Sequence, residues 1–413
     1  MAQIKPFQAV RPTEEFADRV AALPYDVYNR EEATKEVQRE PLSFLKIDRA
    51  ETQFPADVDT YDDRVYDKAA KLLDEMEKDG VYISDNEQAY YIYRLTMNGR
   101  AQTGIVACAG VDDYLNNVIK KHENTREEKE QDRIRHVDTL NAQTGPIFLA
   151  YRSRSEINEV VSRVMETQKP LYDFTAVDGI SHTVWKIADH KQVAQIQDTF
   201  ASINEIYIAD GHHRAASAVK VGLKRREEHP GYNGTEEFNY FLSVLFPDDQ
   251  LMIMDYNRVV SSLNGLSTEA FLEETGKIFK VTKLGETAKH PVHKGQFTMY
   301  LDGQWYSLDA SEEMLKETDA VKSLDVSLLQ TYLLEPVLGI HDPRTDARID
   351  FVGGIRGLEE LERRAQSDMK VAFAMYPTSI AELFAVADAG LLMPPKSTWF
   401  EPKLRSGLFI HKI

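Results

Sequence analysis

Apolar positions recur at helical spacing in one early stretch and at strand spacing in the next. Between Tyr61 and Asp79 they stand three and four positions apart, and Gly80 follows as a stop signal, which predicts a helix. Two strand-like runs follow, Ala89 to Met97 and Gln102 to Val111. Because Asn98-Gly99 joins them, and this dipeptide favours tight hairpin turns, we predict a β-hairpin.

Four prolines are spread over the first 51 residues, and we expect them to break this stretch into short strands and turns rather than long helices. They are Pro6, Pro12, Pro24 and Pro41. Further along, the pattern predicts a helix with a broken start from Val118 to about Leu140, a strand at Pro146–Tyr151, a helix at Ser155–Gln168, a strand at His182–Ile187, a helix at Val193–Phe200, a strand at Glu205–Ala209, a helix at Arg214–Arg226, and strands at Phe238–Leu245 and Met252–Val259.

After about residue 260 the pattern alternates between helix and strand. We predict a helix at Thr268–Phe279, a hairpin at Asp302-Gly303, a helix at Asp325–Val337, a strand at Asp350–Val352, a helix at Gly357–Gln366, a strand at Lys370–Met375 and a helix at Ser379–Ala389. Such alternation indicates an α/β layer, so the predicted fold class is α/β of the mixed α+β kind.

Composition narrows the function classes. The 413 residues hold 49 Lys+Arg against 67 Asp+Glu, a net charge of −18, which disfavours a binder of duplex DNA. A single cysteine, Cys108, permits no intrachain disulfide and no cysteine-based zinc site. With no signal-peptide pattern and no apolar run of about 20 residues, we expect a cytoplasmic protein that binds neither membrane nor nucleic acid.

The most informative segment runs from Ile208 to Ala218. A strand delivers Asp210 to a loop, Gly211 permits a backbone conformation closed to other residues, and His212, His213 and Arg214 follow on the first turn of a helix. Unpaired helix amides and a bidentate Arg favour phosphate. The alternatives are an ordinary helix start with a capping Asp, and a metal site, which is disfavoured because adjacent helical side chains point apart.

A second segment, Lys121 to His136, is dense in charge. If it is helical, five potentially cationic groups form one continuous face that could meet a polyphosphate: His122, Arg126, Lys129, Arg133 and His136. The alternative is a solvated helix with internal salt bridges through Glu127, Glu128 and Glu130.

Two further segments could contact a substrate. Between Leu392 and Gly407, prolines hold the chain extended, and Lys396, Ser397 and Thr398 offer a positive charge and two hydroxyls to a substrate. The alternative is that this C-terminal segment only packs its aromatic residues into the core. Asp26 could hold a substrate amine or magnesium, although turn chemistry also explains it. No P-loop, dinucleotide, zinc-protease or nucleophile-elbow motif occurs.

The segment Asp210 to Ala218 resembles the phosphate-binding motif of the ParB/sulfiredoxin superfamily, Gly-x-x-Arg followed by small residues, and its doubled-His form is similar to that of ParB-like free-serine kinases. Over nearly the whole chain the sequence resembles the family known as domain of unknown function 1015. This resemblance is carried by Pro24-Tyr25-Asp26-Val27, His122-Glu123-x-Thr125, Lys129, Asp132-Arg133, the doubled-His motif and Met393-Pro394-Pro395-Lys396-Ser397-Thr398.

The resemblance implies a nucleotide-binding core in residues 1–260 and a C-terminal α/β domain in 261–413, whose last segment could return to the site. It implies ATP or ADP, with CTP possible, and Mg²⁺. The donor phosphates would be held by Gly211, His212, His213, Arg214, His122, Thr125, Lys129 and Arg133. Asp210 would bind magnesium or take the substrate proton, with Glu123 as the competing base and His213 as a further catalytic group; Asp26, Lys396, Ser397 and Thr398 would contact the substrate.

The function expected from this resemblance is phosphoryl transfer to a small hydroxyl-bearing metabolite, with free serine as the implied acceptor. In one alternative the same site acts as a phosphatase or a nucleotide hydrolase. The other is a nucleotide-gated switch without metabolic catalysis, although the helix-turn-helix that a DNA clamp needs is not found. A homodimer is possible.

Overall fold

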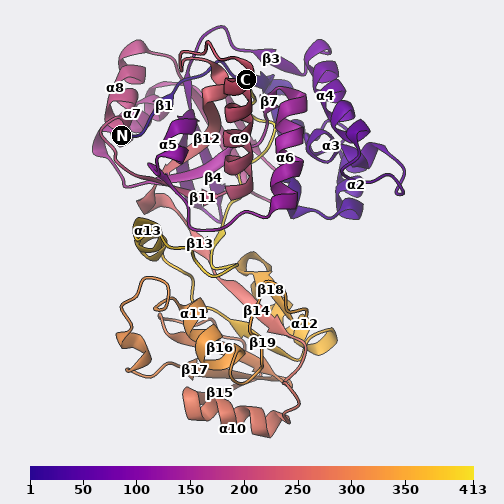
Figure 1. The fold of residues 1–413 in the computed structure, drawn as a ribbon, viewed down its shortest axis with the longest axis vertical. Helices are drawn as coiled ribbons and strands as arrows, with labels where there is room; N and C mark the ends of the chain where they lie inside the picture. Colours follow the sequence, from indigo (N-terminus) through magenta and orange to yellow (C-terminus); the bar gives the residue numbers. More distant parts are fainter. The chain divides into compact units, whose positions relative to one another are not determined.

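The computed structural model describes residues 1–413, which fold into two units (Figure 1). Unit 1 comprises Met1–Leu251 together with Pro402–Ile413, and unit 2 comprises Met252–Glu401. The chain therefore leaves unit 1 once and returns to it for the last residues. The fold is mixed α/β, as the sequence predicts, with 38% helix and 25% strand.

A nine-stranded mixed sheet forms the centre of unit 1. Its order is β6 (Ile119–Lys120), β11 (Ile206–Asp210), β8 (Ile147–Tyr151), β12 (Tyr240–Pro247), β5 (Arg100–Gly110), β4 (Tyr90–Met97), β10 (Ser181–Ile187) and β9 (Tyr172–Thr175), with β1 (Ile4–Lys5) also paired to β5. Only the pairs β6–β11 and β8–β12 are parallel. The predicted hairpin is confirmed as β4–β5, and Asn98 and Gly99 both have positive φ, as its tight turn requires.

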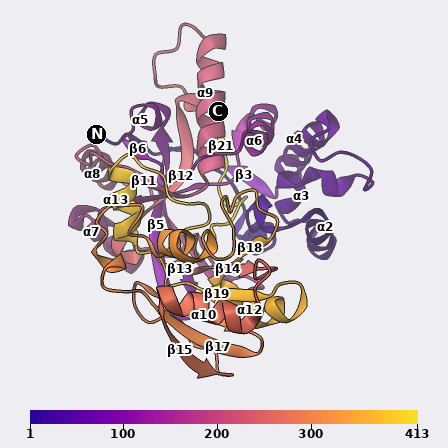
Figure 2. The same cartoon turned by 60° about the horizontal axis from the view of Figure 1, so that its bottom comes forward.

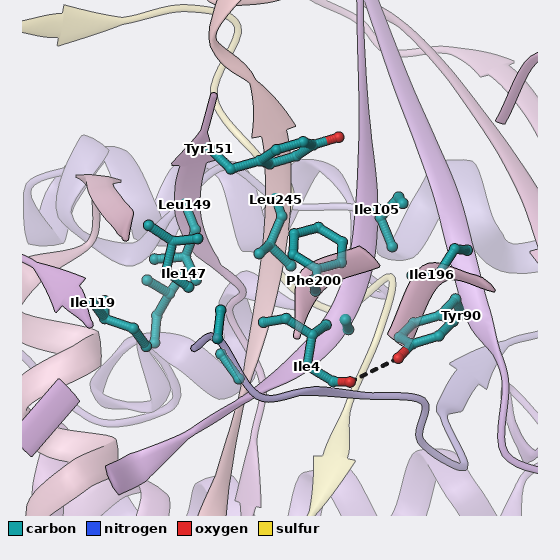
Figure 3. Packing of buried hydrophobic residues seen from close by; sticks show 14 of the residues in the cluster. Ile4, Tyr90, Ile105, Ile119, Ile147, Leu149, Tyr151, Ile196, Phe200 and Leu245 are labelled. Carbon is teal, nitrogen blue, oxygen red and sulfur yellow. Dashed lines mark hydrogen bonds between the residues drawn. The ribbon is translucent and has the colours of Figure 1, made fainter. Parts of the chain in front are cut away.

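Helices cover this sheet. They include α5 (Val111–Leu115), α6 (Glu127–Leu140), α7 (Ser155–Thr167), α8 (His190–Phe200) and α9 (His212–Glu228). Isoleucine, leucine, valine and aromatic side chains of the strands pack against α7 and α8 in one core cluster, part of which Figure 3 shows. Within it the Tyr90 hydroxyl donates a hydrogen bond to the Ile4 carbonyl at 2.8 Å, so this buried polar group is satisfied.

A second core lies among the N-terminal helices of unit 1. These are α1 (Ala17–Val20), α2 (Arg30–Arg39), α3 (Leu45–Asp48) and α4 (Asp63–Lys78), beside the small sheet of β2 (Val10–Pro12) and β3 (Tyr82–Ser84). The expectation of only short strands and turns before Glu51 missed α2. The prolines flank this helix, and Asn29 and Glu32 form a capping box at its start. Both ribbon views show α4, α6 and α9 side by side (Figures 1 and 2).

Unit 2 is built on a six-stranded antiparallel sheet. The strand order is β15 (Lys280–Gly285), β17 (Gln304–Asp309), β16 (Gln296–Leu301), β19 (Val371–Ala374), β14 (Tyr256–Val260) and β18 (Ile349–Gly353). Its helices are α10 (Thr268–Ile278), α11 (Asp325–Leu329), α12 (Gly357–Ser367) and α13 (Ile380–Asp388), and a two-stranded sheet joins β13 (Ile253–Met254) to β20 (Trp399–Phe400). The hairpin predicted at Asp302-Gly303 is confirmed, whereas the helix predicted over Asp325–Val337 changes to a π-helix at Gln330–Leu334.

The last twelve residues, Pro402–Ile413, which we call the strap, thread through unit 1. Ser406 exchanges backbone hydrogen bonds with Ala22, Ile410 exchanges them with Val10, and β21 (His411–Lys412) pairs with β7 (Ala142–Gln143). Gly407 allows this path because it has φ +82° and its Cα lies against the Phe44 ring. No helix in the fold has the length and apolar character needed to cross a membrane.

Candidate functional site

The β11–α9 turn forms the predicted strand, tight loop and helix. Strand β11 ends at Asp210, Gly211 has φ +93°, and α9 begins at His212. A Cβ at position 211 would lie 3.1 Å from the Arg214 guanidinium, so glycine is required both for the backbone angle and for the approach of Arg214. Ala215 and Ala216 are buried and let the helix pack closely on the sheet.

Arg214 is held in one orientation beside the helix start. Its Nη1 donates to the Pro146 carbonyl at 2.7 Å, and the side chain passes close to both Gly145 and Gly211. The side chain is only 13% exposed, and its nearest carboxylate oxygen, Oδ2 of Asp210, is 4.0 Å away. The guanidinium is therefore preorganised, with N–H donors beyond the one used by Pro146.

Both carboxylate oxygens of Asp210 accept a hydrogen bond. Oδ1 accepts from the Gly211 N–H at 2.9 Å, and Oδ2 accepts from Nζ of Lys403, a strap residue, at 3.2 Å. Burial by itself raises the pKa of Asp210, but the cations of Lys403 and Arg214 outweigh it and hold this pKa well below its usual range. Lys403 thus lies beside the predicted site residue Asp210, and the sequence pattern did not single it out within the Leu392–Gly407 segment.

His122 and His212 form a buried, perpendicular pair. Their ring centroids are 4.5 Å apart, and the His122 backbone N–H points at Nε2 of His212, 3.5 Å away. Nδ1 of His212 then carries the proton and lies 4.0 Å from Oε2 of Glu123. Burial lowers the pKa of His122 to about 4 and that of His212 well below its ordinary value, so both rings are neutral at pH 7.

The structure corrects the predicted cationic face over Lys121–His136. Helix α6 begins only at Glu127, so His122 and Arg126 precede it and no continuous helical face joins the five groups. The preceding loop instead wraps the start of α9, because the Arg126 N–H donates to Nε2 of His213 at 2.9 Å. The Thr125 hydroxyl donates to Glu130 at 2.8 Å, and Lys129 is exposed on α6.

Arg133 is buried in α6 rather than presented to solvent. Its guanidinium pairs with Asp132 at 2.8 Å and lies 4.1 Å from the centroid of the Tyr25 ring. Burial disfavours the charge, but Asp132 and Tyr25 outweigh it and raise the pKa of Arg133. Asp26 lies beside Tyr25 in a short 3-10 turn, Tyr25–Val27, and is exposed. Tyr25 and Asp26 line a cleft of about 620 Å³ together with Lys129 and Arg133.

The predicted substrate residues Lys396, Ser397 and Thr398 belong to unit 2. Ser397 donates its hydroxyl hydrogen to the Pro394 carbonyl at 2.6 Å, and the Lys396 ammonium lies 5.5 Å from the centroid of the Tyr256 ring. The Trp399 ring packs in van der Waals range of Gly353. The segment therefore packs its aromatic side chain within unit 2, and its substrate contact stays a prediction.

Magnesium at Asp210 does not fit the arrangement of this carboxylate. A divalent cation needs a carboxylate oxygen free of competing cations, but Oδ2 faces the Lys403 ammonium and Oδ1 accepts from Gly211. The structure also contains no group of three or more His, Cys, Asp or Glu side chains able to hold a metal ion. The reaction proposed below therefore uses no metal ion bound by Asp210.

Fold and site together define a mixed α/β protein with an anion-binding geometry at the N-terminus of a sheet-packed helix. The profile of the family described as "Protein of unknown function (DUF1015)" matches residues 4–327, and the chain belongs to this family. The resemblance to this family is thereby confirmed over residues 4–327. No curated protein matches the chain.

Several solved structures are distantly similar to this chain. A C-terminally truncated SbnI from Staphylococcus aureus is 13% identical with a TM-score of 0.37, over 73% of this chain and 85% of that one. A mutant free serine kinase in complex with AMP is 11% identical with a TM-score of 0.35, over 73% and 91%. A conserved hypothetical protein from Pyrococcus furiosus is 14% identical with a TM-score of 0.34, over 74% and 94%. These TM-scores are too low to assign an activity.

Proposed function

We propose that this protein is a phosphotransferase that binds ATP or ADP at the β11–α9 turn and phosphorylates a small hydroxyl-bearing metabolite. The observation that carries the proposal is the convergence of Arg214 and Lys403 at the start of α9, although Lys403 stands 193 residues after Asp210. Free serine is the acceptor that the sequence resemblance implies.

The donor phosphates would bind where unpaired donors are concentrated. The first N–H groups of α9 have no partner within the helix, and the helix dipole adds a partial positive charge there. Arg214 supplies a bidentate donor, and Lys403 supplies a compact cation. His122 and His212 add no charge because both are neutral, so the charge of the phosphates is balanced mainly by Arg214 and Lys403.

Glu123 is the better base of the two carboxylates considered. Asp210 binds protons weakly because its pKa is held well below the usual range, whereas the Glu123 side chain is 44% exposed beside His212. In the proposed step the acceptor hydroxyl gives its proton to Glu123 as its oxygen bonds to the terminal phosphorus. The bond from that phosphorus to the bridging oxygen breaks, and ADP leaves when ATP is the donor.

Product analysis tests this function directly. The full-length protein is incubated with ATP or ADP, Mg²⁺ and serine, together with a panel of hydroxyl-bearing metabolites, and new phosphorylated products are sought by mass spectrometry. A phosphorylated acceptor supports the proposal. Release of inorganic phosphate with no acceptor product would establish a hydrolase instead, and nucleotide-dependent binding of DNA with no product would establish a switch protein.

Replacing Arg214 tests the phosphate site itself. We expect Arg214→Ala to weaken ADP binding by about 10- to 100-fold, because a charge-assisted bidentate contact contributes about 1.5–3 kcal/mol. Arg163→Ala is the matched control, since Arg163 is exposed on α7. Affinity is measured by calorimetric titration, and circular dichroism checks the fold. Unchanged ADP affinity in a folded Arg214→Ala protein would contradict the site.

A further inference from the structure

The cleft of about 620 Å³ lies within unit 1, beside the phosphate site. Residues of the N-terminal helices, of the loop before α4 and of α6 line it, and its polar lining includes Tyr25, Asp26, Asp57 and Lys129. Burial lowers the pKa of His213, while Asp26 raises it and Lys129 lowers it, so one end of the cleft is electrostatically coupled to the β11–α9 turn.

Most charges in the lining are already paired. Arg30 donates to the Val58 and Pro55 carbonyls, Arg49 binds Glu51 and two backbone carbonyls, and Arg133 binds Asp132. Six acidic residues face four Lys or Arg residues there, and His136 is neutral at pH 7 because burial lowers its pKa to about 4. The cleft is therefore net acidic, in contrast to the neighbouring phosphate site.

A few polar groups in the lining have no partner in the protein. The carboxylates of Asp26 and Asp57 and the ammonium of Lys129 form no hydrogen bond or ion pair. The Tyr25 hydroxyl makes no hydrogen bond in the protein either, and this oxygen is open to solvent although most of the residue is buried. Burial raises the pKa of Tyr25 to about 12, so this group is a neutral donor and acceptor.

We propose that this cleft holds the acceptor, and that the acceptor is a hydroxylated primary amine larger than free serine, of the size of an amino sugar. The proposal rests on the proposed function for its assignment of the acceptor role, but not for the binding itself. Asp26 and Asp57 offer two unpaired carboxylates for the amine, and Tyr25 offers a hydrogen-bond partner for a ligand hydroxyl.

The charge and the size of the cleft both bear on which ligand it takes. A nucleotide polyphosphate would meet two unpaired carboxylates against one unpaired ammonium, so the cleft disfavours it. Clefts of about 300–1,000 Å³ usually take ligands of drug-like size, so this cleft has room for an acceptor larger than serine. Tyrosine rings in the lining add faces against which an ammonium or a sugar ring can pack.

Calorimetric titration of the full-length protein tests the selectivity. The probes are D-glucosamine and D-glucose, which differ at one amine-for-hydroxyl exchange, with L-serine as the small amine. We expect D-glucosamine to bind at least tenfold more tightly than either D-glucose or L-serine. Equal affinities, tighter binding of D-glucose or L-serine, or no binding of D-glucosamine at millimolar concentration would overturn the proposal.

Variants then place the ligand in the cleft. Asp26→Asn and Tyr25→Phe should each weaken D-glucosamine binding about tenfold, while Asp74→Asn, on the exposed face of α4, should leave it unchanged. Unaltered D-glucosamine affinity in both cleft variants would overturn the assignment. ADP titration separates the two claims, because loss of the nucleotide site leaves D-glucosamine binding intact, and loss of the cleft leaves ADP binding intact.

Discussion

Lys403, near the end of the chain, places a positive charge beside Asp210 at the proposed phosphate site. It donates to Asp210 at 3.2 Å and is mostly buried. We expect Lys403→Met to weaken ADP binding about tenfold, because a partly desolvated cation near phosphate contributes on the order of 1.4 kcal/mol. The pKa of Asp210 should rise toward its usual range, since Lys403 is the stronger of the two cations that lower it.

Lys412→Met is the matched control for Lys403→Met, because Lys412 lies in the same strap and pairs with Glu77, away from Asp210. Calorimetric titration with ADP compares the two variants, and Lys403→Arg should restore most of the affinity. Should Lys403→Met bind ADP as well as the unmodified protein, the lysine would only anchor the strap.

The two cations of the proposed phosphate site differ in how well the sequence predicts them. Arg214 and Gly211 are four residues or fewer from Asp210, so the local motif predicts their roles in one turn. Lys403 reaches Asp210 only through the return of the strap, and the sequence pattern could not distinguish it from Lys396 in the same proline-rich segment. Long-range pairing of this kind depends on the packed fold, which no local periodicity records.

At the scale of elements, two helical glycines are expected to respond oppositely to alanine. In an open helix, Gly→Ala stabilises by about 1 kcal/mol, and Gly276 in α10 has nothing within 4 Å of a new Cβ. At Gly222 in α9 the new Cβ would lie 2.5 Å from the Phe238 carbonyl oxygen. We therefore expect Gly276→Ala to raise the free energy of unfolding by about 1 kcal/mol and Gly222→Ala to lower it by about 1–3 kcal/mol.

Denaturant unfolding of the two glycine variants against the unmodified protein measures both changes. The pair is informative because propensity alone predicts the same sign at both positions, so a stabilising Gly222→Ala would show that α9 can move away from Phe238. A destabilising Gly276→Ala would mean that α10 does not have the open face described for it.

Element boundaries show where sequence periodicity was sufficient and where it was not. The β4–β5 hairpin follows from alternation and an Asn-Gly turn, both of which are local. The start of α6 at Glu127 does not, because the N–H of Arg126 binds His213 on another helix, and no local pattern records that contact. Tertiary hydrogen bonds compete with helix propensity there, and the extended loop wins.

For the whole molecule, the net charge of −18 proves to be a poor guide to the site. The chain is acidic overall, yet two cations lie beside the Asp210 carboxylate at the β11–α9 turn, and the adjoining cleft is acidic. The expected change in character near residue 260 falls close to the point where the chain leaves unit 1 after Leu251. The return at Pro402 carries no compositional signal, because a strap of twelve residues is too short to show one.

Acid should affect the two units in opposite directions. Unit 1 buries His122, His136 and His182, and burial lowers their pKa values to about 4, about 4 and about 3. With an unfolded pKa near 6.5, each stabilises the fold fully above that pH and loses about 2 kcal/mol by pH 5. Burial also raises the pKa of Asp113 in unit 1 to about 6, and protonation of this carboxyl stabilises the unit by only about 1 kcal/mol as the pH falls to 5.

Unit 2 has only exposed histidines, His290, His293 and His341, while burial raises the pKa of its Asp325 to about 6. A carboxyl with a raised folded pKa becomes protonated first in the folded state, so unit 2 should gain about 1 kcal/mol between pH 7.5 and 5. Hydrogen exchange read by mass spectrometry, with intrinsic rates corrected for pH, should show protection falling in unit 1 peptides and rising in those around Asp325. His182→Asn should reduce the pH dependence of unit 1, and a parallel response of both units would show that these buried groups titrate at their ordinary pKa values.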